Sequence, residues 1–303
     1  MSQPGPTDPG PIPPGPIPPG HPGPDDAPSH GPQPRTRLDR ALVDRGLLPS
    51  RSRAAREIAA GRVSVNGATV VKPAVEVTAA DTLTVDDPDP WVARSAHKLL
   101  GALTDFGVDR LDGLTALDAG ASTGGFTQVL LSRGVGEVWA VDVGHDQLAE
   151  ILRTDARVHV REGLNLRALA GSDVPAHGVD LVVADVSFIS LRLLLEPLLA
   201  TVRPGGELLL MVKPQFELAR SVLDKHGVVT KPADRRRAIA SVLDAIDATG
   251  ARVTDIAASA LPGPSGNREY FLRVRPESTP PASDRLDTAA VRARLEEIME
   301  GES

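Results

Sequence analysis

The segment LTALDAGASTGGF, residues 114–126, decides how the rest of this chain folds. A short apolar run leads into an aspartate, and Gly120, Gly124 and Gly125 then open a helical pattern. A buried strand followed by a small-residue turn and a helix is the first unit of an α/β sheet. Small residues let a ligand approach the backbone. Because the spacing differs from G-x-G-x-x-G, two interpretations stay open: a nucleotide-like ligand, or a tight turn whose glycines serve packing.

Apolar runs of the same kind recur along the chain, separated by helical patterns: EVWAVDVG (137–144), VHVREG (158–163), VDLVVADVSF (179–188) and GELLLMVK (206–213). Runs that are apolar on both faces are typical of a parallel sheet covered on both sides. The last two runs, VTDIAASAL (253–261) and REYFLRVRP (268–276), are joined by a short link, which predicts an antiparallel pair. We therefore predict an α/β domain over 96–276 with a mostly parallel seven-stranded sheet.

A smaller unit precedes this domain. Residues 35–86 contain two short helical patterns, the second with Ser50 as its N-cap. Two alternating runs then surround Asn66-Gly67, the strongest short hairpin signal. Between residues 35 and 72, nine Lys and Arg stand against three Asp and Glu, although the whole chain has a net charge of −7. The sequence therefore predicts a locally basic α+β module over 35–86, followed by a linker over 87–95.

The two ends of the chain differ from these units. Residues 1–34 hold 14 of the 28 prolines and no Lys or Arg. This composition predicts a disordered tail, either dispensable or a ligand for a proline-binding module. Residues 277–303 form a second, polar tail, in which one helical pattern falls near 286–299.

Composition excludes several kinds of chemistry. The chain has no cysteine, so disulfides, thiolate metal sites and cysteine nucleophiles are absent, which fits a reducing cytoplasm. No apolar stretch approaches about 18 residues and the first residues lack a signal-peptide pattern, so we expect neither a membrane span nor export. The seven histidines show no paired ligand spacing such as H-E-x-x-H, and we expect no metal site.

Charged residues stand where the predicted strands end, which is where an open parallel sheet binds its ligands. Asp142 ends the second strand and suits the two hydroxyls of a ribose, although a helix cap is an alternative. Asp185 ends the fourth strand and Lys213 the fifth, so both belong at one rim. A lysine there can act as a base near neutral pH with the aspartate orienting it, and a structural ion pair is the alternative.

Two more charged residues are candidates. Lys98 lies in the first turn of a predicted helix, where a cation opposes the helix dipole, although such a lysine is normally a surface residue. Glu269 follows a flexible loop in GPSGNREYF (263–271) and starts the last strand. A solvated charge on an edge strand is the alternative for this glutamate.

These motifs together resemble a known family. Residues 35–85, with RLDRALVDRGLLPSR and AGRVSVNGATVVKP, resemble the S-four-type RNA-binding module of the small ribosomal subunit. The remainder resembles an FtsJ-like (RrmJ-like) methyltransferase that depends on S-adenosylmethionine. The combination of LDAGASTGGFTQVLL, AVDVG, DVSFISL, VKPQFE and GNREYF resembles the TlyA family of ribosomal RNA 2′-O-methyltransferases, whose older label is hemolysin.

The resemblance implies specific roles. A catalytic tetrad would consist of Lys98, Asp185, Lys213 and Glu269, with Lys213 as the general base. Adenine would lie near EGLN (162–165). The expected contacts to S-adenosylmethionine are Asp118, Gly120, Ser122, Thr123, Gly124, Gly125, Phe126, Asp142 and Asn165. The arginines expected to contact RNA phosphates are Arg35, Arg37, Arg51, Arg53, Arg56 and Arg62.

The implied substrate is ribosomal RNA, at cytidines of 16S and 23S rRNA within 30S and 50S subunits. Two motifs depart from the family pattern: RSAHKL lacks the usual Gly-rich S-R-G-G-x-K-L, and Arg268 precedes Glu269.

Three other functions stay open. An RNA-binding regulator with an inactive methyltransferase fold would need a broken loop or tetrad. A membrane-active hemolysin would need a span, a signal peptide or a cationic amphipathic helix. A DNA or protein methyltransferase is disfavoured by the absence of an N-P-P-Y-like motif.

Overall fold

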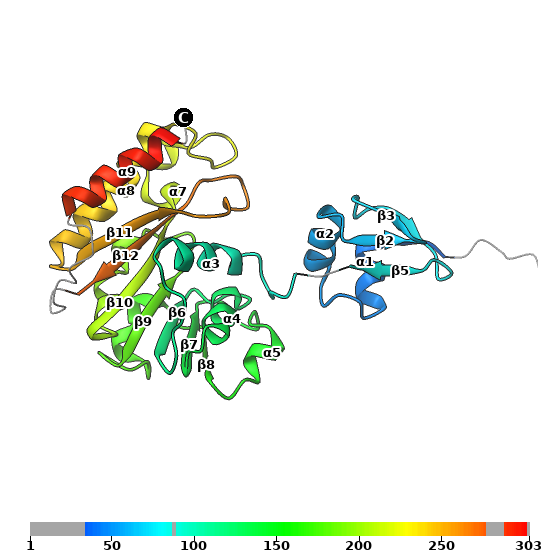
Figure 1. Cartoon of the computed structure of the whole chain (residues 1–303), viewed down its shortest axis with the longest axis horizontal. Helices are drawn as coiled ribbons and strands as arrows, with labels where there is room; N and C mark the ends of the chain where they lie inside the picture. The colour runs from blue at the N-terminus through cyan, green and yellow to red at the C-terminus, as the bar shows by residue number, and fades with distance from the viewer. Residues whose placement is uncertain (1–33, 87–88, 277–287, 302–303) are drawn as a thin grey trace, which may run out of the picture. The chain divides into compact units, whose positions relative to one another are not determined.

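The computed structural model describes residues 34–86, 89–276 and 288–301. The chain divides into two compact units, Met1–Asp89 and Pro90–Ser303 (Figure 1). The proline-rich tail predicted over 1–34 lies outside the described residues, apart from its last one. None of the helices in the described parts of the chain combines the length and the apolar character needed to cross a bilayer.

The first unit is a small α+β module. Its elements are β1 (Thr36–Arg37), α1 (Leu38–Asp44), α2 (Arg51–Ala59), β2 (Val63–Val65), β3 (Ala68–Thr69), β4 (Glu76–Val77) and β5 (Leu83–Val85). The predicted helix cap is confirmed, because the Ser50 hydroxyl accepts a hydrogen bond from the Arg53 amide at 3.2 Å. The predicted hairpin is confirmed as well: Asn66 and Gly67 have φ of 52° and 80° between the antiparallel strands β2 and β3.

The second unit contains the predicted seven-stranded sheet. Its strands are β6 (Thr115–Ala119), β7 (Glu137–Asp142), β8 (Val158–Glu162), β9 (Val179–Ala184), β10 (Val202–Val212), β11 (Arg252–Ala258) and β12 (Tyr270–Arg275). They lie in the order β11-β12-β10-β9-β6-β7-β8. Strand β12 runs antiparallel to both of its neighbours, and the other pairs are parallel. The carboxyl ends of β6, β7, β9 and β10 therefore share one rim, and the start of β12 reaches the same rim.

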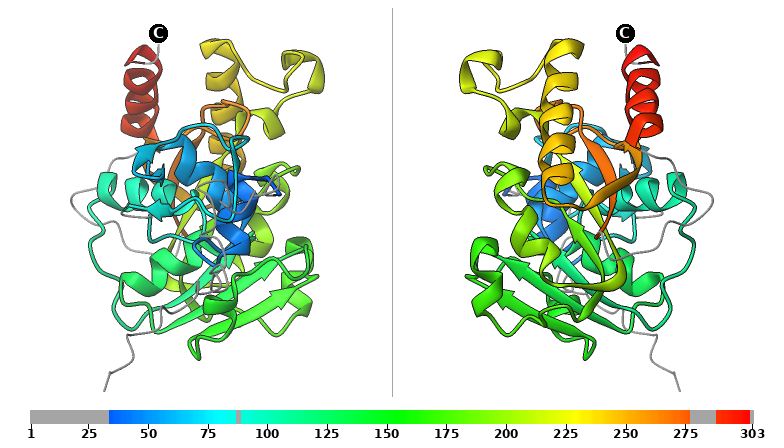
Figure 2. Two further views of the ribbon diagram at one scale, coloured as in Figure 1. Left: turned by 90° about the vertical axis from the view of Figure 1, so that its right-hand side faces the viewer. Right: turned by 90° about the vertical axis from the view of Figure 1, so that its left-hand side faces the viewer.

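Helices cover both faces of this sheet. The elements are α3 (Ala96–Asp105), α4 (Gly125–Ser132), α5 (Glu150–Arg153), η1 (Leu166–Gly171), η2 (Leu191–Leu193), α6 (Leu195–Leu199), α7 (Pro214–Glu217), η3 (Arg220–Val222), α8 (Pro232–Ala248) and α9 (Thr288–Gly301). One core cluster joins α3 and α4 to one face of the sheet, and another joins η1, α6, α8 and α9 to the opposite face (Figure 2). The alternation of strands and helices explains the continuous apolar runs of the sequence.

The C-terminal segment corrects one expectation. Residues 277–303 were expected to form a polar tail, yet α9 contributes Val291, Leu295 and Met299 to the core, each at most 3% exposed. These residues recur every four positions, so they form one apolar stripe that packs against β11. The second unit therefore extends beyond residue 276.

The packing of α9 can be tested with Leu295→Ala. We expect this change to lower the free energy of unfolding of the second unit by about 2–4 kcal/mol, because it removes a buried leucine side chain and leaves a cavity. Urea denaturation followed by fluorescence suits the test, since both tryptophans of the chain, Trp91 and Trp139, belong to this unit. Glu297→Ala, on the exposed face of the same helix, is the control. Equal effects of the two changes would contradict the packing.

Candidate active site

A buried ion pair lies where β9 and β10 end. The two strands are parallel with Leu210 opposite Ala184, so the residues that follow them meet at the rim. Lys213 Nζ lies 2.5 Å from Asp185 Oδ1, and it also donates a hydrogen bond to Ser187 Oγ at 2.8 Å. Their side chains are only 9% and 15% exposed. The apolar strand β10 thus ends in a lysine whose charge has a partner.

A second ion pair lies beside the first. Lys98 Nζ, from the first turn of α3, lies 2.5 Å from Glu269 Oε2, and both side chains are almost fully buried. Strand β12 is antiparallel to β10 with Tyr270 opposite Val212, so the residue before Tyr270 has to lie at the same rim as Lys213. The structure thereby brings together the four charged residues expected to form the tetrad.

The four charges line or support one small cavity. Lys98, Asp185 and Lys213 are among the residues around a volume of about 220 Å³, and Glu269 lies behind Lys98. Two cations and two anions sum to zero, which makes their joint burial tolerable. Removing one partner would leave an uncompensated buried charge, at a cost of about 3–5 kcal/mol.

A larger cavity adjoins the first. Its volume is about 570 Å³, which falls in the range of small-molecule sites. Both cavities include Gly120, Ser122, Asp185 and Ser187, so a ligand in one lies directly beside a ligand in the other. The residues found only around the larger cavity are Asp142, Val143, Gln147, Asn165, Leu166, Val186, Phe188, Ile189 and Leu194.

The larger cavity has features that fit a nucleoside. Gly120 has φ of 89°, and a Cβ on it would lie 2.9 Å from the Asp185 carbonyl oxygen, so only glycine suits this position. The Asp142 carboxylate accepts hydrogen bonds from the amides of Ser122 at 2.9 Å and Gly144 at 2.7 Å. These bonds fix the carboxylate, and each oxygen keeps a lone pair that can accept from a ribose hydroxyl.

The loop after β7 is held by Glu162. Its carboxylate accepts hydrogen bonds from the amides of Asp146 and Gln147 at 3.0 Å and pairs with Arg153 at 2.9 Å. The hydrogen bond from Arg153 is the main cause that lowers the pKa of Glu162 to about 2. Gln147 in turn lies 3.2 Å from the Ser122 hydroxyl, so the loop forms one wall of the larger cavity.

Several residues expected to contact the cofactor have other surroundings. Asp118 is fully buried, accepts a hydrogen bond from the Thr127 hydroxyl at 2.6 Å and lines neither cavity. A Cβ on Gly124 would collide with Leu152, and one on Gly125 with Ser95. These three residues therefore let α4 pack closely, and their contact with the ligand stays a prediction. Of the other expected cofactor contacts, Thr123 lines neither cavity. Those that line one of the two cavities are Gly120, Ser122, Phe126, Asp142 and Asn165.

Five of the six arginines expected to contact RNA form two clusters around acidic residues. Arg37 and Arg51 pair with Asp39 at 3.0 and 2.9 Å, and about half or more of each arginine side chain stays exposed. The buried carboxylate of Glu57 is surrounded by three arginines, namely Arg53, Arg56 and Arg62. The remaining member, Arg35, lies 3.8 Å from Glu76 and is 68% exposed.

These arginine side chains differ in how much of their surface is exposed to solvent. The Arg53 side chain is only 10% exposed and lies 2.6 Å from Glu57, so neutralising that carboxylate is its first role. Arg35, Arg37 and Arg51 keep the exposure that a phosphate contact requires.

Phe188 is a site residue that sequence reasoning missed. It is 91% exposed and has φ of 65°, a backbone region that bulky residues rarely adopt. Its ring centroid lies 5.2 Å from that of Phe216, and it lines the larger cavity. An exposed aromatic ring held in a strained loop beside a nucleoside-sized cavity is suited to stacking on a base. The motif DVSFISL contains this phenylalanine, but the sequence shows neither its strained backbone nor its exposed ring.

The rim contains other side chains that lie within the quoted motifs but were not singled out as site residues. Arg94 and Ser95 line the smaller cavity from the segment before α3, and Pro264 lines it from the loop before β12. Ser187 lines both cavities and accepts from Lys213. These residues come from segments that are distant in the sequence, and local sequence patterns do not reveal that the segments meet at one cavity.

Glu217 fixes the loop that carries Ser187 and Phe188. Its side chain is 1% exposed and accepts hydrogen bonds from the Ser190 hydroxyl at 2.5 Å and the Leu191 amide at 2.7 Å, with Arg192 at 3.2 Å. Glu217 ends α7 and is the last residue of the VKPQFE motif, four residues after Lys213. One carboxylate therefore ties the loop after β9 to the segment after β10.

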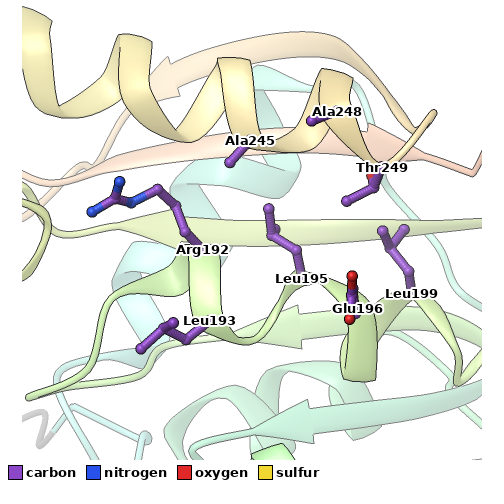
Figure 3. Close-up of a pocket in the computed structure, with 8 residues that line it drawn as sticks. All are labelled: Arg192, Leu193, Leu195, Glu196, Leu199, Ala245, Ala248 and Thr249. Atoms are coloured by element: carbon purple, nitrogen blue, oxygen red, sulfur yellow. The ribbon is translucent and has the colours of Figure 1, made fainter.

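A third cavity lies away from the rim. It has a volume of about 800 Å³ and lies between the α6 segment and α8 (Figure 3). Leucine and alanine side chains provide most of its lining, and Arg192 is already engaged by Glu217. Although this cavity is larger, it brings together no set of groups suited to chemistry, so the rim is the candidate active site.

Comparisons with known proteins agree with this geometry. Residues 91–275 match FtsJ-like methyltransferases, and residues 36–83 match the S4 domain. The Mycobacterium tuberculosis 16S/23S rRNA (cytidine-2′-O)-methyltransferase TlyA is 46% identical over 246 residues, which cover 80% of this chain and 91% of that protein. The Campylobacter jejuni 23S rRNA (cytidine-2′-O)-methyltransferase TlyA is 34% identical over 60% of this chain and 69% of its own. A solved structure from Streptococcus thermophilus that bears the name hemolysin has a TM-score of 0.65 and 31% identity, covering 89% of this chain and 98% of its own.

Fold and site together define a class. A seven-stranded sheet with an antiparallel β12, a glycine turn after β6 and a carboxylate at the end of β7 are the features of an S-adenosylmethionine-dependent methyltransferase of the FtsJ-like type. With the additional S4 domain and the extent of its identity to TlyA, the chain belongs to the TlyA family.

Glu217 provides the first test of the site. We expect Glu217→Ala to lower kcat for methyl transfer about tenfold, because the loop that positions Ser187 and Phe188 loses its anchor. Glu217→Gln keeps acceptor capacity on its amide oxygen and should restore most of that loss. Steady-state kinetics with both variants, folded as judged by circular dichroism, make the comparison. A Glu217→Ala enzyme with unchanged kcat would rule out the positioning role.

Asp118 provides a second test, through pH. Burial raises the pKa of Asp118 to about 7, although the hydrogen bond from Thr127 opposes this shift. The native state therefore keeps a proton that the unfolded chain releases near pH 4, so this carboxyl makes the protein less stable as pH rises toward 7.

Asp118→Asn removes this titration and keeps an acceptor for Thr127. Between pH 5 and 7 we expect the wild type to lose on the order of 2 kcal/mol of unfolding free energy relative to the variant. Urea denaturation at several pH values measures this difference. Parallel stability profiles for the two proteins would show that Asp118 does not titrate in this range.

Proposed function

We propose that this chain transfers a methyl group from S-adenosylmethionine to the 2′-hydroxyl of cytidine in ribosomal RNA. The observation that carries the proposal is the neutral cluster of Lys98, Asp185, Lys213 and Glu269, which borders a cavity shared with a nucleoside-sized site. A ribose hydroxyl is a weak nucleophile, so such a reaction needs alignment of the oxygen and removal of its proton.

The larger cavity is the proposed cofactor site. When bound, S-adenosylmethionine supplies a methyl group carried on a positively charged sulfur. Asp142 would hold the two ribose hydroxyls, Asn165 and Leu166 would lie beside the base, and Gly120 would leave room next to the rim. The cavity lining shared by Gly120, Ser122 and Asp185 would bring the reactive end beside the tetrad.

Lys213 is the proposed proton acceptor. In its neutral form it would take the proton from the 2′-hydroxyl, and the ammonium that results is stabilised by Asp185 at 2.5 Å and by the Ser187 hydroxyl at 2.8 Å. Lys98 has donors beyond the one that meets Glu269, and these would hold a ribose oxygen. Phe188 would stack on the base of the target nucleotide.

The S4 domain is the proposed docking module. Arg35, Arg37 and Arg51, the most exposed of its six arginines expected to bind RNA, would contact phosphates and position the structured RNA. We propose both 30S and 50S subunits as substrates, because the relative with 46% identity is named for both 16S and 23S rRNA. Because the proposed substrates are assembled ribosomal subunits, we propose that the protein acts in the cytoplasm.

The role of Lys213 is tested by two substitutions. Lys213→Ala should abolish methyl transfer, with a loss of about 10³-fold or more, while the affinity for S-adenosylmethionine changes little. Lys213→Arg keeps a cation opposite Asp185 but cannot accept a proton, so it should be almost as inactive. Transfer of labelled methyl groups to ribosomal subunits and calorimetric cofactor binding measure the two properties. Substantial activity of Lys213→Arg would show that this position acts as a fixed charge rather than as a base.

A further inference from the structure

The segment between α7 and α8, residues 218–231, is a cationic loop on an acidic protein. Arg220, Lys225 and Lys231 are exposed, and none of them forms an ion pair with another residue in the described parts of the chain. The one carboxylate of the loop, Asp224, accepts hydrogen bonds from the amides of His226 and Val228 and so stabilises the turn. Three cations against one anion contrast with the net charge of −7 for the whole chain.

The base of this loop is fixed to the active site. Asn267, only 3% exposed, accepts a hydrogen bond from the Val229 amide at 3.0 Å and donates one to the Gly227 carbonyl at 2.9 Å. Buried Arg235, from α8, donates to the Thr230 carbonyl at 3.0 Å. Asn267 belongs to the turn that supplies Pro264 to the smaller cavity and that precedes Glu269.

The rest of the loop projects away from the unit. In both views of Figure 2 the yellow-green segment between α7 and α8 stands off from the sheet and its helices. Connections of this length with little regular structure are uncommon in compact domains and are usually either functional or linkers, and this one contains only the single turn η3. The bonds that shape the loop come from the backbone, Asp224, Asn267 and Arg235, so its exposed cations are free for another purpose.

We propose that the 218–231 loop is a second RNA-binding element, which contacts phosphates of the ribosomal RNA close to the target ribose. The loop starts just after Lys213 and is tied to the turn before Glu269, so phosphates bound there neighbour the nucleotide in the smaller cavity. Contacts that lysine and arginine side chains make to phosphates carry no base preference. The loop thus sets position rather than sequence. This inference rests on the proposed function, because it takes ribosomal RNA as the substrate.

The test is the full-length chain with Arg220→Ala, Lys225→Ala and Lys231→Ala combined. We expect KM for the ribosomal subunit to rise about tenfold with kcat nearly unchanged, because the contacts act in binding. In binding assays with protein-free ribosomal RNA, the slope of log affinity against log salt should fall by about 2. Cofactor affinity should stay at the wild-type value.

A matched control removes three exposed arginines at the opposite rim of the sheet, where the parallel strands start. Arg110, Arg157 and Arg252 lie just before or at the starts of β6, β8 and β11, and their combined change to Ala should leave KM and the salt slope as in the wild type. If the two triple variants had equal effects, the change in KM would follow from the net charge of the protein rather than from the loop, and the proposal would be overturned.

Two further outcomes would also overturn it. A loop variant with wild-type KM and wild-type salt slope would show that the loop does not bind the substrate. A raised KM for subunits with an unchanged salt slope on protein-free RNA would assign the loop to an acidic protein surface instead. Failure of the wild type to methylate any ribosomal RNA would count against the proposed function alone, since the RNA-binding measurement still decides the role of the loop.

Discussion

The joint burial of four charged side chains at one rim is the constraint on which the active site depends. Lys213 cannot lie at the end of an apolar strand without Asp185, and Lys98 cannot lie beside it without Glu269. Meeting both demands requires the parallel pair of β9 and β10, the first turn of α3 and an antiparallel β12 inserted next to β10. Since β12 runs against its neighbours, the residue before it reaches the rim at which the other strands end. The strand order therefore serves the chemistry directly.

The loops around this rim are held by buried polar groups rather than by regular structure. Glu217 anchors the loop after β9, Glu162 anchors the loop after β7, and Asn267 joins the loop before β12 to the cationic 218–231 loop. Each anchor makes at least two hydrogen bonds to its loop with one side chain, which fixes the loop at little cost in chain length. The site thus keeps a rigid frame at its base, while Phe188 and the exposed cations face outward. This division suits a folded RNA substrate, which needs both a fixed reacting centre and an accessible surface.

Most of the fold could be predicted from local patterns, because apolar runs, turn residues and helix caps act over short distances. The meeting of Asp185 with Lys213 also followed from the rule that parallel strands end at one rim. Family resemblance placed Lys98 and Glu269 in one site, but no pattern predicted that they pair with each other, since the pairing depends on where α3 and β12 lie. The expected ligand contacts of Asp118 and Gly124 stay predictions, and the structure adds a packing role for both residues that local sequence patterns do not reveal. The stripe of Val291, Leu295 and Met299 was present in the sequence, yet the polar residues around it concealed its place in the core.

The central claim is that this rim methylates a ribose hydroxyl of ribosomal RNA. The most direct measurement is transfer from labelled S-adenosylmethionine to purified 30S and 50S subunits, followed by nuclease digestion and mass spectrometry of the labelled nucleoside. The account predicts 2′-O-methylcytidine, with the label on the ribose. A methyl group on a base, or no transfer to either subunit by a protein that binds the cofactor, would contradict it.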